Sequence, residues 1–403
     1  MSKLSELINK LCPNGVEYKK IKDAFQRLRG TPITASQMKQ IQNEDGEITI
    51  FAGGKTVVRA KEEDIEKANI TRVPAVLVQS RGIIDFIYYD KPFTFKNEMW
   101  AYTAENSITV KYLYYVLQNN AGYFREAASG MGSLPQISLR VTEDYLIPLP
   151  PLEIQRELVE ILDKFAQLTA ELTAELQKRK KQYEHYRRAL LGGVESGELK
   201  VESGYQMVKL GDVCDFVYGY TDKAKDVGDA RFIRITDIND GGHLNRDGAK
   251  YITLNSEAKK FLLRKGDLLM ARTGATYGKT LYYDSEEPAV YASFLIRVIP
   301  DDMRLNNRFY WHFSQSTLYW DQAKRLVTAG GQPQFNVGAI SQVSIPLPPL
   351  AEQERIVAIL DRFDSLCNSL TEGLPAEIEL RKKQYEYYRD KLLGFSGELR
   401  VES

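Results

Sequence analysis

The chain has 403 residues, of which 43% are hydrophobic and 27% charged, and its 54 Lys and Arg balance its 54 Asp and Glu. This ordinary globular composition allows two or three domains, and no apolar run reaches the roughly 20 residues of a membrane span. The charge balance argues against a histone-like or tail-mediated polyanion binder, so any contact with nucleic acid must come from local basic patches.

The first fifteen residues, MSKLSELINKLCPNG, predict a short amphipathic helix and have no signal-peptide pattern, so a soluble, cytoplasmic protein is expected. The three cysteines are few, odd in number and far apart, which indicates neither a disulfide framework nor a zinc site. They are Cys12, Cys214 and Cys367, and the histidines His185, His243 and His312 do not cluster either.

The first section, residues 1–146, carries strand-like runs at 48–54, 74–82 and 83–90 and a helical pattern at 110–120. Short β-rich runs separated by Gly and Pro, together with one helix, predict an α+β domain.

The second section, residues 147–204, opens with IPLPPL and continues as a helical pattern. Pro150 and Pro151 suit a helix start, which is expected at about Leu152. Apolar residues then recur in steps of four and three, with one stutter of two fours, which is typical of a heptad seam. The seam comprises Ile154, Leu158, Ile161, Phe165, Leu168, Leu172, Leu176, Tyr183, Tyr186 and Leu190.

Residues 205–344 and 345–403 repeat this plan. AVLVQSRG followed by IYYD corresponds to DLLMARTG followed by LYYD. GSLPQI corresponds to GQPQF, and these two segments lie just ahead of the IPLPPL copies. Both helical patterns close with RKKQYE and then SGEL(K/R)VES. The chain is therefore a duplication of a domain plus a helix of about 40 residues. Its second seam comprises Ile356, Ile359, Phe363, Leu366, Leu370, Leu374, Ile378, Tyr385, Tyr388 and Leu392.

Acidic residues dominate the first part of each helix and basic residues the second part. Two such helices pair best antiparallel, which would place one domain at each end of the pair. The separation of acidic and basic residues along each helix could also be explained by the helix dipole alone. The apolar seam that both helices share nevertheless needs another helix to pack against.

No catalytic motif is evident. Residues 272–280 resemble a phosphate loop but have three residues between the glycines instead of four, so a β-hairpin with a basic tip at Arg272 and Lys279 is favoured. Glu198 and Lys200 fit half of a nuclease site without its upstream partner. The tetrapeptide of an amino-methyltransferase and the hydrolase elbow are both missing.

Gly-rich loops with polar or basic neighbours remain as candidates. Glycines permit close approach to phosphates, and Arg, Gln and Asn present donors to base edges. Each loop alone could be a plain turn, but similar loops recur in both domains. The candidate DNA-binding residues are Lys55, Arg59, Arg81, Gln136, Arg234, Arg272, Tyr277, Lys279 and Gln334.

These features together resemble the specificity (S) subunits of type I restriction-modification systems. The resemblance covers the whole chain. It is carried by the two IPLPPL openings followed by Gln155 and Gln353, by the ILD(K/R)F motifs at 161–165 and 359–363, and by the RKKQYE closings.

The resemblance implies two pseudo-symmetric target-recognition domains, separated by an intramolecular antiparallel coiled coil of two long helices. Each domain would read one half of a bipartite site in double-stranded DNA. The subunit would be non-catalytic, present as one copy per complex, and would dock two modification (methyltransferase) subunits and the restriction subunits. S-adenosylmethionine, ATP and Mg²⁺ are expected in those partners and no cofactor or metal in this chain. The expected docking residues are Gln155, Phe165, Tyr183, Gln353, Phe363 and Tyr385.

The first helix contains a tandem Thr-Ala-Glu-Leu repeat at 169–176, and the second is four residues longer between its ILD and RKK motifs and includes Gly373 and Pro375. Four residues add about 6 Å of helix, and DNA rises about 3.4 Å per base pair. One added repeat should therefore widen the gap between half-sites by one or two base pairs. Pro375 should bend or interrupt the second helix.

Two other functional classes stay open at this stage. The chain could be a nuclease or methyltransferase itself, which its missing motifs disfavour, or a scaffold whose domains bind proteins. The bases recognised do not follow from the sequence.

Overall fold

The computed structural model describes residues 3–54, 56–128, 134–192, 205–245, 247–328, 333–369 and 372–395. The chain divides into two compact units, one formed by Met1–Glu171 with Glu379–Ser403 and the other by Leu172–Ile378. Each unit holds one globular domain and a part of both helical regions. Among the described helices, none is both long and apolar enough to cross a membrane.

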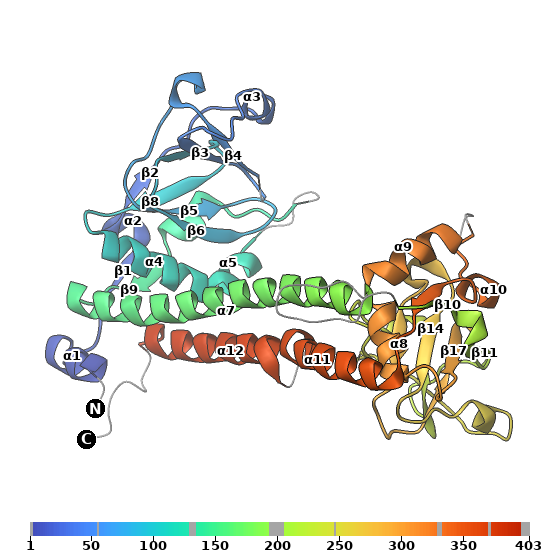
Figure 1. Ribbon diagram of the computed structural model, residues 1–403. Helices are drawn as coiled ribbons and strands as arrows, with labels where there is room; N and C mark the ends of the chain where they lie inside the picture. The colour runs from blue at the N-terminus through green and yellow to red at the C-terminus, as the bar shows by residue number, and fades with distance from the viewer. Residues whose placement is uncertain are drawn as a thin grey trace. The chain divides into compact units, whose positions relative to one another are not determined.

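The domain of the first unit contains two larger sheets and the two-stranded sheet of β1 (Tyr18–Lys20) and β9 (Leu146–Pro148); Figure 1 shows their arrangement. Four antiparallel strands run in the order β2 (Gln26–Leu28), β8 (Trp100–Thr103), β5 (Ala75–Gln79) and β6 (Asp85–Tyr89). Every residue of the central strand β5 is buried, which explains its unbroken apolar run. In the second sheet, β3 (Ile48–Phe51) pairs antiparallel with β4 (Val57–Ala60) and parallel with β7 (Phe93–Phe95).

Helix α4 (Ser107–Asn119) packs on β5 and β6 and lies between their sheet and α7 (Figure 1). Its N-terminus is capped by Asn106, whose side chain accepts a hydrogen bond from the amide of Ile108. Strand β1 (Tyr18–Lys20) pairs with β9 (Leu146–Pro148), so IPLPPL begins as a strand before the helix starts. The remaining helices of this unit are α1 (Lys3–Leu11), α2 (Ile21–Ala24), α3 (Ala35–Gln40), η1 (Glu62–Asp64), α5 (Ala121–Glu126) and α6 (Leu139–Glu143).

The domain of the second unit repeats this topology strand for strand. Its sheets have the orders β11-β17-β14-β15, β13-β12-β16 with one parallel pair, and β10-β18. The strands are β10 (Met207–Lys209), β11 (Cys214–Tyr218), β12 (Ala230–Ile233), β13 (Tyr251–Ile252), β14 (Leu268–Ala271), β15 (Thr280–Tyr282), β16 (Ala289–Tyr291), β17 (Leu295–Pro300) and β18 (Ser344–Pro346). Its helices are η2 (Leu210–Asp212), η3 (Ile235–Asp237), η4 (Ala258–Phe261), η5 (Gly274–Thr276), α8 (Asn307–Ser314), α9 (Thr317–Leu326) and α10 (Val337–Ile340).

The predicted strands, the helix predicted at 110–120 and the duplication are thus confirmed. The hairpin favoured over a phosphate loop is also present, because β14 and β15 pair antiparallel on either side of η5. The closing SGEL(K/R)VES segments, at 196–203 and 396–403, lie outside the described residues.

The long helices start where the prolines predict. α7 (Leu152–Gly192) is continuous over 41 residues, whereas the second region is split into α11 (Leu350–Asn368) and α12 (Gly373–Leu393). The predicted interruption near Pro375 is confirmed. Pro375 itself lies in the first turn of α12, where its missing N–H costs nothing, and seam position Leu370 falls outside the described residues.

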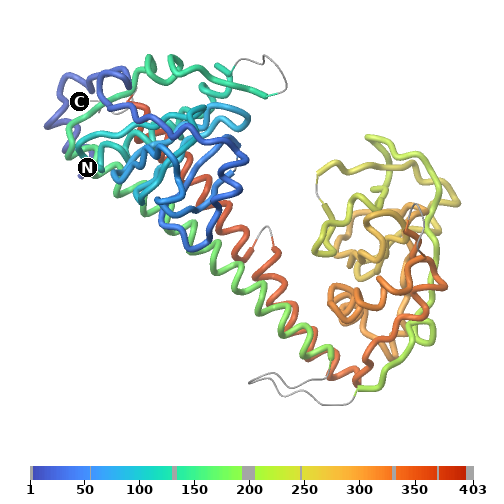
Figure 2. Tube along the Cα trace, turned by 90° about the horizontal axis from the view of Figure 1, so that it is seen from above, coloured from blue at the N-terminus to red at the C-terminus, as the bar shows by residue number. Residues whose placement is uncertain are grey.

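Both units pair α7 with the second region side by side (Figures 1 and 2). In the first unit Phe165 of α7 contacts Tyr385 and Tyr388 of α12, with ring centroids 6.4 and 5.6 Å apart. In the second unit Tyr183 and Tyr186 of α7 contact Phe363 of α11, at 5.9 and 5.4 Å. Early residues of one helix thus meet late residues of the other, which is the antiparallel order.

One detail of the predicted seam is wrong. Leu168 is 47% exposed. The stutter that begins at this residue shifts the line of apolar side chains away from the contact with the second helix. Three acidic residues of α7 form ion pairs with residues outside the second long helix. Glu157 pairs with Lys3, Asp163 with Lys111, and Glu175 with Arg179 of the same helix.

Candidate nucleic-acid interface

A short turn after strand β5 is joined by backbone hydrogen bonds to the segment ahead of IPLPPL. The amide of Gly82 donates to the carbonyl of Pro135 at 2.8 Å, and the amide of Ile137 to that of Ser80 at 3.0 Å. These bonds set Arg81 opposite Gln136, and Gly82 has a φ of +80°, which favours glycine. We call residues 80–82 with 135–137 the bridged turn of the first domain.

The second domain has the same bridged turn, formed by residues 272–274 and 333–335. Gly274 donates to Pro333 at 3.1 Å and Phe335 to Arg272 at 2.8 Å, which sets Thr273 opposite Gln334. Gly274 has a φ of +72°. The structure therefore brings together the predicted residues Arg81 with Gln136, and Arg272 with Gln334.

A glycine beside each bridged turn lets two backbones approach closely. A Cβ atom on Gly30 would lie 2.2 Å from the carbonyl oxygen of Phe95, and one on Gly219 would lie 2.2 Å from that of Ala292. The residues just before these glycines, Arg29 and Tyr218, consequently occupy equivalent places. The residues that form the bridged turn are similar in the two domains and include Gln136 and Gln334. The exposed residues around the two turns differ.

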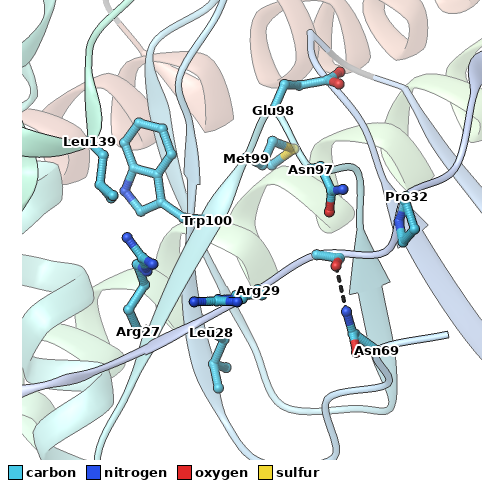
Figure 3. Close-up of a pocket in the computed structure, with 11 residues that line it drawn as sticks. Arg27, Leu28, Arg29, Pro32, Asn69, Asn97, Glu98, Met99, Trp100 and Leu139 are labelled. Atoms are coloured by element: carbon cyan, nitrogen blue, oxygen red, sulfur yellow. Dashed lines mark hydrogen bonds between the residues drawn. The ribbon is translucent and has the colours of Figure 1, made fainter. Parts of the chain in front are cut away.

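In the first domain the surface beside the bridged turn is charged. Arg81 is exposed and, within the described part of the chain, has no side-chain hydrogen bond or ion pair, and the same holds for Arg29. Arg29 and Glu98 line a cavity of about 570 Å³ that also includes Arg27 and Trp100 (Figure 3). Glu98 pairs with Lys96 at 2.9 Å and Arg27 with Glu143 at 3.3 Å.

In the second domain the equivalent surface is aromatic. The guanidinium of Arg272 lies 5.3 Å from the ring centroid of Tyr218 and 5.6 Å from that of Phe294. Its Nε donates to the backbone carbonyl of Ser293 at 3.0 Å. Tyr218 and Phe294 are 44% and 52% exposed, and neither ring was a sequence-based candidate.

The other predicted DNA-binding residues differ in their exposure and in the contacts of their side chains. Arg59 is exposed on β4, and Lys55 lies outside the described residues. Lys279 pairs with Asp240 at 2.5 Å, which lowers the pKa of that carboxyl. Tyr277 packs against Trp320 and Phe335.

Arg234 does not present a free guanidinium. Its Nη2 and Nε bind the carboxylate of Asp237 at 2.7 and 3.1 Å, and Nη2 also donates to the carbonyl of Gly248. The hydrogen bonds to Asp237 raise the pKa of Arg234, and these contacts together give the side chain a structural role in the turn around η3.

Comparison with known proteins now identifies the chain. The model of the type I restriction modification DNA specificity domain matches twice, at residues 13–180 and 202–380. The specificity subunit of the EcoR124I and EcoR124II enzymes of Escherichia coli is 35% identical over 328 residues, which are 77% of each chain. The chain belongs to the type I restriction-modification specificity subunit family.

Further relatives agree with this assignment. A protein of Haemophilus influenzae assigned as a type I restriction enzyme specificity subunit is 33% identical over 323 residues, 75% of this chain and 77% of that one. The crystal structure of the S subunit from M. genitalium shares the fold with a TM-score of 0.60 over 97% and 98% of the two chains, at 16% identity. A structure from work on complex assembly of the type I restriction-modification system matches with a TM-score of 0.53, over 96% and 99%, also at 16% identity.

The specificity subunit fastens each domain to the helix pair through the aspartate of its ILD motif. Asp163 accepts hydrogen bonds from Lys111 at 2.8 Å and from Tyr115 at 2.5 Å, both on α4. Asp361 accepts from Arg308 and His312 of α8, each at 2.7 Å. In both cases the two donors are one helical turn apart, so one carboxylate fixes one helix face.

His312 is fully buried, and this burial lowers its pKa to about 4. The neutral ring donates through Nε2 to Asp361, and its Nδ1 lies 3.3 Å from the hydroxyl of Tyr183. Burial raises the pKa of Asp361, but the hydrogen bond from His312 and the charge of Arg308 outweigh it and leave that pKa below the usual value. This Tyr, His and Asp chain resembles a catalytic relay, but no substrate can reach a side chain that is 0% exposed.

The predicted docking residues belong to two groups. Gln353 is fully buried and Gln155 is 5% exposed; their Nε2 atoms donate to the carbonyls of Pro348 and Pro150. The prediction that these two side chains dock a partner is not supported, because they hold the turn that precedes each long helix. Phe165, Tyr183, Phe363 and Tyr385 instead form the aromatic contacts between the long helices.

Of the described residues, no three His, Cys, Asp or Glu are grouped closely enough to hold a metal ion. The aspartates that anchor the domains are occupied by basic or hydroxyl donors.

Proposed function

We propose that this specificity subunit selects a bipartite, asymmetric site in double-stranded DNA, with each domain reading one half-site through the surface around its bridged turn. The observation that carries this proposal is a backbone arrangement that occurs twice with different exposed side chains. A repeated scaffold with unlike side chains is what two related but different base-reading surfaces require, because sequence is read by side chains at base edges.

The paired long helices set the distance between the half-sites in this proposal. Helix α7 is continuous, and each domain is held to the helices by the aspartate of an ILD motif. In the second unit the buried Gln353 also forms hydrogen bonds with the backbone of Arg304 and Asn306. Because these contacts limit the movement of each domain relative to its helix, the length of the helices should determine the distance between the two half-sites on the DNA.

The subunit itself is proposed to be non-catalytic and to act as one copy in a complex with two modification subunits and the restriction subunits. S-adenosylmethionine, ATP and Mg²⁺ belong to those partners. A docking surface is proposed at a cavity of about 360 Å³ between α1, α7 and α12, lined mainly by Leu4, Ile161, Phe165, Tyr388 and Leu392. Tyr387, on the same helix as Tyr388, is 61% exposed.

The base-reading part is tested with the chain co-purified with its modification subunits and by mapping methylated sites in the host. Arg81→Ala should weaken binding to one half-site by about 1–3 kcal/mol if the contact is to a base. Arg72→Ala is the matched control, because Arg72 is a surface arginine of the same domain that already pairs with Glu62. Equal binding of every DNA sequence by the wild-type complex would contradict the proposal.

The docking part is tested by co-purification. Phe165→Ala should reduce recovery of the modification subunit, whereas Leu380→Ala, at a 53% exposed position of α12 away from the cavity, should not. Full recovery with Phe165→Ala in a folded chain would place the docking surface elsewhere.

A further inference from the structure

We infer that Tyr218, Arg272 and Phe294, here called the aromatic clamp, bind a guanine in the major groove of the half-site read by the second domain. This inference rests on the proposed function and assigns a base to one of its two surfaces. Arg272 belongs to the bridged turn of the second domain. Tyr218 and Phe294 come from the neighbouring ends of β11 and β17, and Arg272 follows the end of β14.

The geometry of the clamp holds the arginine in a fixed orientation. The guanidinium lies over the rings of Tyr218 and Phe294, 5.3 and 5.6 Å from their centroids, and Nε donates a hydrogen bond to the carbonyl of Ser293. These three contacts restrict the long side chain before any ligand arrives, so less rotamer entropy is lost on binding.

The two terminal nitrogens of Arg272 remain available. Nη1 and Nη2 have no hydrogen-bond or ion-pair partner among the residues that the structure describes. Two neighbouring arginines of the same domain differ in this respect, since Arg297 binds Asp267 and Arg234 binds Asp237. The guanidinium of an arginine with a purely structural role is expected to be bonded by a carboxylate of the protein. The terminal N–H groups of Arg272 are instead available to a ligand.

Paired guanidinium donors match the O6 and N7 acceptors of guanine, the base that arginine recognises most often. The exposed rings of Tyr218 and Phe294 suit the same surroundings, because apolar side chains contact thymine methyl groups and sugars at the groove. The first domain has Arg29, Ser80 and Glu98 at the equivalent positions, with Arg29 and Glu98 lining its cavity (Figure 3). Its half-site is therefore read by different chemistry, as an asymmetric site requires.

The test uses the full chain co-purified with its modification subunits and DNA duplexes carrying the mapped site. Replacing the contacted guanine should weaken binding of the wild-type complex by about 5- to 150-fold, the range that one bidentate pair supplies. Arg272→Ala should lose about the same factor on the original site and become indifferent to that base. Arg325→Ala, at an exposed arginine of α9, is the control and should leave the base preference unchanged.

Arg272→Lys keeps the charge but not the planar pair of donors. It should lose the preference for guanine with little change in thermal stability, which separates a lost contact from a misfolded domain. Phe294→Ala should give a smaller loss at the same base, because Arg272 keeps its donors but not their orientation.

Two results would overturn the inference while leaving the proposed function intact. One is a half-site of the second domain that contains no guanine on either strand. The other is a folded Arg272→Lys complex that discriminates at every position as the wild type does. Sequence-independent binding by the wild-type complex would instead refute the proposed function itself.

Discussion

The two units fasten a globular domain to the long helices in the same way but with different chemistry. In the first, Asp163 binds Lys111 and Tyr115; in the second, Asp361 binds Arg308 and His312. The position of the carboxylate is kept and its partners have changed. The difference shows that the duplicated scaffold is held by its backbone and its ILD aspartates, while the surrounding side chains were free to diverge.

The divergence has a physical consequence, because only the second anchor contains a histidine, whose pKa burial lowers from the ordinary 6.5 to about 4. Burial and Asp163 raise the pKa of Tyr115, so it stays uncharged over the range in which His312 responds. The two halves should therefore respond differently to truncation and to acid.

The largest effect is expected for Tyr183→Ala in the second unit. Tyr183 is 2% exposed, stacks on Phe363 and carries the guanidinium of Arg187 over its ring at 4.0 Å. Its removal should lower the free energy of unfolding by about 4 kcal/mol, as for other buried aromatics. The matched change in the first unit, Tyr385→Ala, should cost about half as much, because Tyr385 is only partly buried.

Hydrogen exchange in α8 and α11 for the first variant, and in α4 and α12 for the second, measures the two losses separately. Equal losses would mean that the two aromatic contacts between the helices are equivalent after all.

Acid should destabilise the second unit first. The unfolded chain binds a proton on His312 near its ordinary pKa of 6.5, whereas the folded chain does so only near 4. Between these values the unfolded state binds more protons, so the free energy of unfolding falls as the pH falls, by at most about 3 kcal/mol in total. Asp361 and Asp364 have lowered pKa values in the folded chain. They therefore add a further decrease in the free energy of unfolding when the pH falls below their usual pKa of 3.8.

Protection factors of α8 amides, corrected for intrinsic exchange rates, should decrease from pH 6.5 to 4.5 more than those of α4. A parallel decrease in both helices would contradict the assigned role of His312.

A smaller difference is expected when the anchors themselves are removed. Asp361→Ala should cost about 2 kcal/mol, because it leaves the buried ring of His312 without its acceptor. Asp163→Ala should cost about 1 kcal/mol, since Lys111 is 31% exposed and can return to water. Urea unfolding followed in each unit measures both, and a larger loss from Asp163→Ala would reverse the comparison.

Much of the architecture could be predicted from local sequence. The helix starts follow from the paired prolines, the β14 and β15 hairpin from the glycines between two apolar runs, and the duplication from repeated motifs. The proline and glycine signals each lie within a few neighbouring residues, and the repeated motifs predict a second domain of the same plan.

The parts that escaped prediction depend on contacts between distant residues. Tyr218 and Phe294 are 76 residues apart and meet at Arg272 only because β11, β17 and β14 are neighbours. Gln155 and Gln353 stand out in the sequence, but only burial shows that they serve the turn beside them. The anchoring aspartates do have a sequence signal, because an aspartate occupies the same place in both ILD motifs, at 163 and 361.

The proposed function depends most on the length of the helix pair. Adding one Thr-Ala-Glu-Leu unit to the tandem repeat of α7 lengthens that helix by about 6 Å and nearly preserves its seam. Mapping of methylated sites in a host that carries this variant should give both original half-sites with the gap between them wider by one or two base pairs. An unchanged gap would contradict a role for the helices in setting the distance between the two base-reading surfaces.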